Sequence, residues 1–111
     1  MLEGRPVLVV GGGRVGQRKV ELLLDSGASV LLVCPDCVDE LKLLAQAGTI
    51  RYEARMFEDA DVAGCALVFA CTDDKHANRR ILEVAKAVKI PCCCADGNWP
   101  DGDFVTPAII R

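Results

Sequence analysis

A short apolar segment followed at once by a run of glycines constrains the fold more than any other feature of the sequence. Residues 7–10 read Val-Leu-Val-Val, and residues 11–16 read Gly-Gly-Gly-Arg-Val-Gly. An apolar run of this length indicates a strand that is buried on both faces of a sheet. Because an amphipathic helical pattern follows over residues 14–25, the chain is predicted to pass from a buried strand through a tight turn into a helix.

Strand-like and helix-like segments alternate along the rest of the chain. We expect further strands over residues 30–33, 50–56, 66–70, 90–95 and 104–110, and helices over residues 39–47 and 74–88. In the last helix, Thr72 or Asp73 is the expected N-terminal cap, and the expected buried face comprises Ala77, Ile81, Val84, Ala85 and Val88. This alternation predicts an α/β fold, a Rossmann-like, doubly wound parallel sheet, in a single domain over residues 1–111.

Composition and charge argue against several classes of protein. Thirteen basic and sixteen acidic residues give a net charge of -3, whereas a protein that binds nucleic acid through its phosphates needs a basic surplus. No apolar run reaches the roughly 18 residues of a membrane span, and no secretory signal precedes the first strand. We therefore expect a cytoplasmic protein with no nucleic-acid or membrane partner. The chain ends at Arg111 directly after an apolar segment, and we expect a fragment that lacks dimerisation and C-terminal segments.

The sequence contains seven cysteines, most of them within apolar runs. Residues 34–37 read Cys-Pro-Asp-Cys, a spacing found in redox motifs, and residues 92–94 are three consecutive cysteines. Successive side chains of a strand point to opposite faces, so these three cannot all bind one metal ion. With one histidine and one Cys-x-x-Cys pair, a four-ligand zinc site is hard to assemble, and we expect no metal site. Cysteines in apolar runs are expected to pack as small hydrophobic residues in a reducing cytoplasm.

The glycines match the pattern G-x-G-x-x-G of dinucleotide-binding turns. In that role Gly11 permits the tight turn, Gly13 allows the backbone to approach a pyrophosphate, and Gly16 allows the helix and the strand to pack closely. The phosphates would meet unpaired N–H groups at the N-terminus of the helix. A glycine-rich turn that binds nothing is the alternative interpretation.

The ribose end of such a site is less regular in this sequence. An acidic residue is expected at the end of the second strand, about 20 residues beyond the glycines, where Cys34 and Pro35 stand and Asp36 follows. Asp36 either binds the ribose hydroxyls or is a solvated turn residue. Residues 28–41 contain no lysine or arginine, which favours NAD over the 2′-phosphorylated NADP.

Several segments together resemble the precorrin-2 dehydrogenase family, which includes the N-terminal part of siroheme synthase. The resemblance extends over nearly the whole chain and is carried by residues 4–19 (GRPVLVVGGGRVGQRK), 23–28 (LLDSGA), 70–74 (ACTDD), 78 (N), 95–96 (AD) and 104–110 (FVTPAII). It implies NAD-dependent oxidation of the tetrapyrrole precorrin-2 to sirohydrochlorin. It also implies insertion of Fe²⁺ in bifunctional members and a homodimer in the full-length protein.

The same resemblance implies contacts between individual residues and the cofactor. Arg14 and Val15 match the family's phosphate contacts, which are made by the backbone. Pro35 and Asp36 match its contacts to the adenosine ribose. Thr72 matches a position beside the bound dinucleotide.

Asp96 is the expected catalytic residue. It matches the key carboxylate of the resembled family and follows the predicted fifth strand, and open α/β sheets bind ligands beyond the carboxyl ends of their strands. A carboxylate there can accept a proton as a general base. A turn-forming aspartate before Gly97 is the alternative role. The sequence departs from the family at Cys93, where Asn is common, and in the loop after Asp96, where Pro100 comes later than the family's proline.

Two other functions are compatible with the same fold. A non-catalytic, NAD-sensing regulatory Rossmann module has about this size and the same glycine-rich turn. A dehydrogenase fragment without its substrate domain is the third possibility. A sensor requires neither Asp96 nor the segment 104–110, so these two features favour the enzyme.

Overall fold

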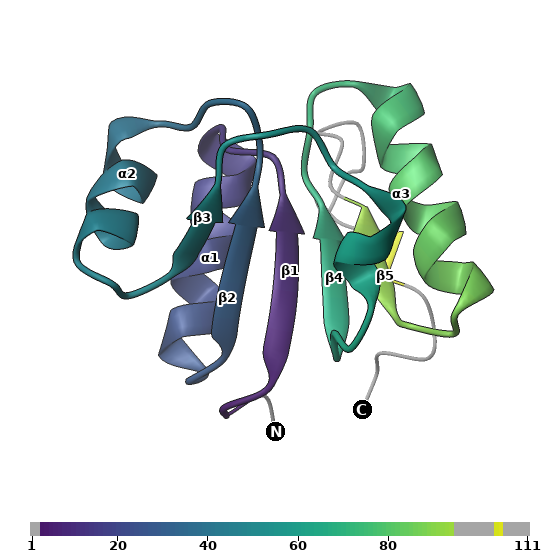
Figure 1. The fold of residues 1–111 in the computed structure, drawn as a ribbon, viewed down its shortest axis with the longest axis horizontal. Coiled ribbons are helices and arrows are strands. Elements are labelled where there is room, and N and C mark those ends of the chain that lie inside the picture. The colour runs from purple at the N-terminus through teal and green to yellow at the C-terminus, as the bar shows by residue number, and fades with distance from the viewer. Residues whose placement is uncertain (1–2, 95–103, 106–111) are drawn as a thin grey trace.

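Five parallel strands form the centre of the computed structural model, which describes residues 3–94 and 104–105 (Figure 1). The strands are β1 (Pro6–Val10), β2 (Ser29–Val33), β3 (Arg51–Glu53), β4 (Leu67–Ala70) and β5 (Cys92–Cys94). A short strand β6 (Phe104–Val105) pairs antiparallel with β5, and the order across the sheet is β3-β2-β1-β4-β5-β6. The predicted Rossmann-like α/β fold is therefore confirmed.

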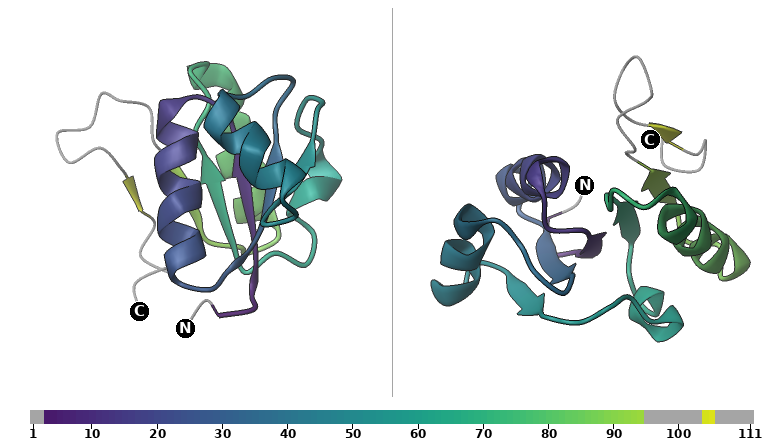
Figure 2. Two further views of the ribbon diagram at one scale, coloured as in Figure 1. Left: turned by 90° about the vertical axis from the view of Figure 1, so that its left-hand side faces the viewer. Right: turned by 90° about the horizontal axis from the view of Figure 1, so that it is seen from above.

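Helices cover both faces of this sheet (Figure 2). Helices α1 (Arg14–Asp25) and α2 (Asp39–Gln46) lie on one face, and α3 (Lys75–Ala87) and the 3-10 helix η1 (Asp59–Val62) lie on the other. The sheet is thus doubly wound, as predicted. Within the described residues, no helix combines the length and the apolar character needed to cross a membrane.

Strand β1 is buried on both faces, as its sequence predicts. Val7 and Val9 belong to the core beneath α1 and α2, whereas Leu8 and Val10 belong to the core beneath α3 and η1. None of the four side chains is more than 3% exposed. Burial of one such side chain contributes about 1.5 to 3 kcal/mol, so β1 is a firmly anchored central strand. The burial of β1 therefore fixes the position of the first residue of the glycine turn that follows it.

The predicted boundaries agree with the structure to within two residues for most elements. The predicted strand over residues 50–56 is wrong beyond Glu53, where the chain leaves the sheet and Arg55 bonds back to the Glu53 side chain. Helix η1 was not predicted, because four residues are too few to show a helical period. Of the predicted strand over residues 104–110, the structure describes residues 104–105, and they form β6.

Both ends of α3 differ from the prediction. Asp74, rather than Thr72 or Asp73, is the N-cap, and its side chain accepts hydrogen bonds from two N–H groups of the first turn at 2.9 and 3.3 Å. Val88, predicted to be buried, is 54% exposed. It is the C-cap residue, so it lies beyond the last turn that packs on the sheet.

The link between β3 and η1 is held by the guanidinium of Arg55. This group donates two hydrogen bonds to the Asp61 carboxylate, at 2.7 and 2.9 Å, and one to Glu53 at 2.8 Å. The Asp61 side chain is only 8% exposed and also accepts a hydrogen bond from the Glu58 N–H at 2.8 Å. Arg55 beside it holds the pKa of Asp61 below its usual range. Asp61 is therefore ionised in the folded protein over a wider pH range than in the unfolded chain.

We expect Asp61→Asn to lower the free energy of unfolding at pH 7 by about 1.5 to 3 kcal/mol, the usual worth of hydrogen bonds to a charged group. The folded pKa lies below the value of about 3.9 that is usual for the unfolded chain. The contribution of Asp61 is thus present above the unfolded pKa and is lost as the pH falls through the folded pKa. Urea unfolding at pH 7 and through the acidic range should show the difference between variant and wild type shrinking with acidification.

Asp59→Asn is the matched control for this prediction. Asp59 also pairs with an arginine, Arg80, at 2.8 Å, but both of these side chains are more than half exposed. Such a pair contributes about 0 to 1 kcal/mol. Equal losses in the two variants, or a loss for Asp61→Asn that does not change with pH, would contradict the assignment.

Candidate functional site

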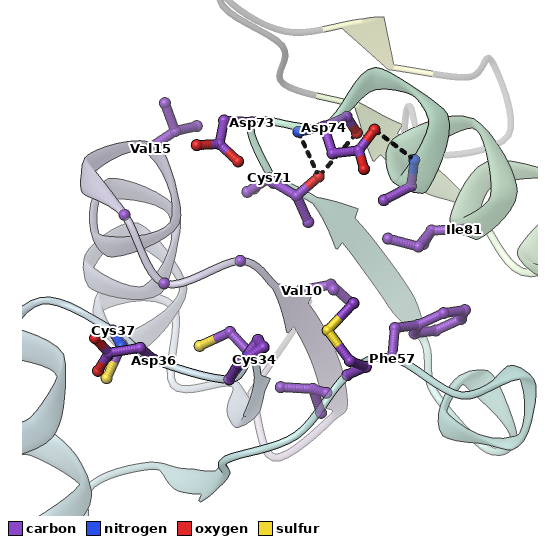
Figure 3. A pocket seen from close by; sticks show the side chains of 18 of the residues that line it. Val10, Val15, Cys34, Asp36, Cys37, Phe57, Cys71, Asp73, Asp74 and Ile81 are labelled. Carbon is purple, nitrogen blue, oxygen red and sulfur yellow. Dashed lines mark hydrogen bonds between the residues drawn. The ribbon is translucent and has the colours of Figure 1, made fainter.

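Three loops meet at the carboxyl edge of the sheet, after β1, β2 and β4. The neighbours β1 and β4 lead into helices on opposite faces, which creates the crevice where open α/β sheets bind ligands. A cavity of about 870 Å³ lies at this point (Figure 3). Its lining comes from residues 10–15 of the glycine turn and α1, 33–38 after β2, 56–57 after β3, and 71–74, 77, 80 and 81 after β4.

Three glycines of the turn leave no room for a side chain. Gly11 has a φ of +118°, and a Cβ there would lie 2.5 Å from the Cys71 carbonyl oxygen in the β4–α3 loop. A Cβ on Gly12 would overlap the β2–α2 loop. A Cβ on Gly16 would overlap the carbonyl oxygen of Gly11. The packing of the turn against its own protein therefore requires these three glycines.

Gly13 is different, because no neighbouring atom of the described chain accounts for its lack of a side chain. A Cβ on Gly13 would meet no atom of residues 3–94 within 4 Å, and its φ of -87° suits any residue. Gly13 lines the cavity and is the N-cap of α1, where no side chain caps the helix. The first N–H groups of a helix have no partner within it, so the glycine leaves this helix end accessible from the cavity.

Of the helix N-termini at this edge, that of α1 is best suited to an anion. Its first turn contains no acidic residue and begins with Arg14. By contrast, Asp74 caps α3, and Asp39 and Glu40 occupy the first turn of α2. Unpaired N–H groups and the helix dipole give the start of α1 a partial positive charge. The pyrophosphate of a dinucleotide fits this position, since it needs the close approach to the backbone that a side chain at Gly13 would block.

Asp36 lines the cavity from the β2–α2 loop (Figure 3). Its carboxylate is 84% exposed, accepts a hydrogen bond from the Cys37 N–H at 2.9 Å, and pairs with Lys42 of α2 at 3.3 Å. Hydrogen bonds from Lys42 and from this N–H hold the pKa of Asp36 below its usual range. Asp36 is thus an exposed turn residue that also faces the cavity, and both roles left open by the sequence stay open. The preference for NAD was inferred from the absence of lysine and arginine in residues 28–41. Lys42 is the next residue after that segment.

The cysteines around the cavity pack as small hydrophobic residues. Cys34, Cys37 and Cys71 are each less than 9% exposed. Burial, with Cys37 next to it, raises the pKa of Cys34 to about 11, and burial raises the pKa of Cys71 to about 12. In both cases burial favours the neutral thiol over the thiolate. Within the Cys-x-x-Cys segment, Cys34 and Cys37 both pack against Gly12.

Asn78 of α3 holds the β4–α3 loop in place. Its Oδ1 accepts hydrogen bonds from the Thr72 N–H at 3.1 Å and the Thr72 hydroxyl at 2.7 Å, and its Nδ2 donates to the Thr72 carbonyl oxygen at 2.9 Å. Asn78 is 3% exposed, so these bonds are shielded from water. Sequence reasoning assigned it no role. The available signal was a polar residue three positions before Ile81, on the buried face of an amphipathic helix.

Sequence reasoning also missed the wall formed by Met56 and Phe57. Both line the cavity, and Met56 is 69% exposed despite its apolar side chain. Met56 directly follows Arg55, whose hydrogen bonds fix the course of this segment. A flexible thioether on a cavity wall is well suited to contact an aromatic ring of a ligand.

Most of the predicted cofactor residues come together in this one cavity. Its lining includes Gly11, Gly13, Arg14, Val15, Pro35, Asp36 and Thr72. Gly16 is buried behind the turn and does not line it. The predicted catalytic residue Asp96 lies outside the described residues.

Comparison with known proteins identifies a family and a set of relatives. Residues 1–108 match the family described as "Putative NAD(P)-binding". The chain is 42% identical over 110 residues to a siroheme synthase of Methylobacillus flagellatus, an alignment that covers 98% of this chain and 23% of that protein. It is 46% identical over 95 residues to a siroheme synthase of Ectopseudomonas mendocina, covering 86% of this chain and 20% of that protein.

Among solved structures, SirC, a precorrin-2 dehydrogenase, has a similar fold. The TM-score is 0.70 at 28% sequence identity, and the alignment covers 73% of this chain and 41% of that one. The chain therefore spans about a quarter of the length of the siroheme synthases it matches and less than half of SirC.

We expect Gly16→Ala to lower the free energy of unfolding by about 1 to 3 kcal/mol, because its Cβ would overlap a backbone oxygen that cannot move aside. The expected loss of stability is opposite in sign to the usual effect of this substitution, because replacing glycine by alanine inside a helix normally stabilises the helix by about 1 kcal/mol. Gly13→Ala, with open space around its Cβ, should change stability by less than about 1 kcal/mol. Urea unfolding of both variants tests the pair, and a more stable Gly16→Ala variant would contradict the packing argument.

Proposed function

Because the chain belongs to the family of NAD(P)-binding domains that forms the N-terminal region of siroheme synthases and includes precorrin-2 dehydrogenase, we propose that it binds NAD and oxidises precorrin-2 to sirohydrochlorin. The dinucleotide-binding part of this proposal rests on the cavity at the carboxyl edge of the sheet. The choice of precorrin-2 rests on the relatives and on the sequence resemblance.

The observation that carries the proposal is the open space at Gly13. Gly11, Gly12 and Gly16 are required by the packing of the protein itself, whereas no atom of residues 3–94 accounts for glycine at position 13. A ligand that approaches the backbone at the start of α1 would account for it. An uncapped helix N-terminus without acidic residues supplies the matching charge.

Each predicted cofactor residue has a task in the proposed complex. Backbone N–H groups of Arg14 and Val15 would donate to the pyrophosphate. Pro35 and Asp36 would contact the adenosine ribose, with the Asp36 carboxylate accepting from its hydroxyls. Thr72, fixed by its three hydrogen bonds to Asn78, would border the dinucleotide on the β4 side.

The oxidation removes two electrons and two protons from precorrin-2. NAD, when bound, supplies the acceptor for a hydride. The second proton must leave the substrate separately, and we propose that the Asp96 carboxylate accepts it as a general base and passes it to water. Asp96 follows β5 by two residues, and β5 runs parallel to β4. The chain therefore enters the segment with Asp96 from the edge of the sheet that bears the cavity.

Two further expectations from the resemblance stay predictions. Insertion of Fe²⁺ into sirohydrochlorin would need a carboxylate that escorts the cation, and Asp96 is the candidate from the sequence. Homodimerisation of the full-length protein is likewise a prediction from the resembled family.

We expect Gly13→Val to weaken NAD binding at least tenfold, which corresponds to about 1.4 kcal/mol, because its branched side chain would occupy the space of the pyrophosphate. The fold should be retained, since none of the atoms that the structure describes would lie within 4 Å of this Cβ. Isothermal titration calorimetry measures the affinity, and circular dichroism checks the fold. Ala87→Val, at an exposed position at the far end of α3, is the control and should bind NAD like the wild type. Unchanged NAD affinity in folded Gly13→Val would place the ligand elsewhere.

We expect Asp96→Ala to keep its NAD affinity and to lose about 10² to 10⁴ in the rate of precorrin-2 oxidation, the usual worth of a general base. NADH absorbance reports the rate, in this chain or in a longer protein that carries it. Asp25→Ala, at the exposed end of α1 away from the cavity, is the control. An Asp96→Ala variant as active as the wild type would refute the role. A longer protein that carries this chain and binds NAD without oxidising precorrin-2 would favour the NAD-sensing alternative.

A further inference from the structure

A lysine of α2 pairs with Asp36 at the ribose end of the cavity, although the lysine itself does not belong to the cavity lining. Lys42 Nζ lies 3.3 Å from Asp36 Oδ1, and Asp36 lines the cavity. The lysine side chain is 45% exposed, so its ammonium group is not buried in the contact. Asp36 beside it raises the pKa of Lys42, the direction that favours the charged ammonium.

This arrangement differs from the usual device that excludes a 2′-phosphate. In most NAD-binding sites of this kind, an acidic residue at the end of the second strand accepts hydrogen bonds from the ribose hydroxyls. When no cation lies next to that carboxylate, its negative charge repels a 2′-phosphate. Here the strand is followed by Cys34 and Pro35, and the carboxylate that comes next already has a cationic partner. The pair therefore offers two partners of opposite charge at one place: a carboxylate for ribose hydroxyls and an ammonium for a phosphate.

We propose that Lys42 forms a 2′-phosphate subsite at the ribose end of the cavity, and that competition between Asp36 and the phosphate for Lys42 sets the preference between NAD and NADP. The inference deepens the proposed function and rests on it.

The physical basis is an exchange of partners. A lysine side chain has a flexible four-carbon stem, so its ammonium can move from the carboxylate to a nearby phosphate. The dianionic phosphate would gain one charge-assisted hydrogen bond, while Asp36 would keep the bond from the Cys37 N–H and remain exposed to water. An exposed ion pair contributes only about 0 to 1 kcal/mol, so little is lost when it opens. Discrimination against NADP should therefore be weak.

The test compares NAD⁺ with NADP⁺, and 5′-ADP with 2′,5′-ADP, by isothermal titration calorimetry on the intact chain. We expect the wild type to bind NADP⁺ within about tenfold of NAD⁺. Lys42→Met should weaken NADP⁺ and 2′,5′-ADP by about tenfold while changing NAD⁺ and 5′-ADP by less than about twofold. Asp36→Asn should strengthen NADP⁺ binding by about tenfold, because it removes a repulsive charge and the competitor for Lys42. The double variant, with both Lys42→Met and Asp36→Asn, should not show this gain in NADP⁺ affinity.

Lys86→Met is the matched control. Lys86 is an exposed lysine near the C-terminal end of α3, so its substitution removes the same charge without touching the cavity. The control separates a specific subsite from the general effect of net charge, and circular dichroism verifies that each variant is folded.

Different results would overturn different statements. If NAD⁺ binds but Lys42→Met shifts both nucleotides equally, or shifts neither, the 2′-phosphate subsite is wrong and the proposed function stands. A gain in NADP⁺ affinity that survives in the double variant would assign the effect to Asp36 alone and also overturn the subsite. If the wild type binds neither nucleotide, the proposed function fails and this inference fails with it.

Discussion

The contact of Gly16 with the Gly11 carbonyl group is the constraint on which the rest of the site depends. Helix α1 can lie this close to the end of β1 only because residue 16 has no Cβ. The same turn packs between two loops. Gly11 contacts the β4–α3 loop, and Gly12 contacts the β2–α2 loop. Because β1 is buried on both faces, these contacts fix the N-terminus of α1 at the carboxyl edge. Gly13 is then the one glycine of the motif whose Cβ would meet nothing in the part of the chain that the structure describes.

The fold could be predicted because its information is local. A strand buried on both faces must be apolar throughout, and the runs at residues 7–10, 30–33 and 66–70 show this directly. Prediction failed between residues 54 and 62, where no periodic pattern determines the backbone. There the course of the chain depends on the Arg55 guanidinium, which bonds Glu53 behind it and Asp61 ahead of it. An ion-pair network of this kind leaves no period in the sequence.

The candidate site could be predicted only in part, for a similar reason. The first three glycines and the residues that follow β2 and β4 belong to segments with recognisable spacing, and they do line one cavity. Lys42 and Asn78 act from within helices, on loops that precede them by six residues. Their effect arises because the first turn of each helix folds back on the loop before it. Site residues that are predicted only from the positions directly after strands therefore do not include Lys42 and Asn78. Asn78 could still be found, because a polar residue on the apolar face of a helix indicates a specific contact.

The distribution of charge around the cavity constrains how a dinucleotide would lie in it. The start of α1 is positive and carries no acidic residue, whereas Asp73 and Asp74 border the cavity on the β4 side. Among the described residues, the position beside Gly13 is thus the one best suited to a pyrophosphate. One nucleoside would extend over the β2–α2 loop, where Asp36 and the exposed side chain of Met56 offer polar and apolar contacts. The other would extend past Thr72 towards the β4 and β5 ends. Since Asp96 follows β5 in the sequence, this orientation directs the redox-active ring towards the segment that carries the proposed base.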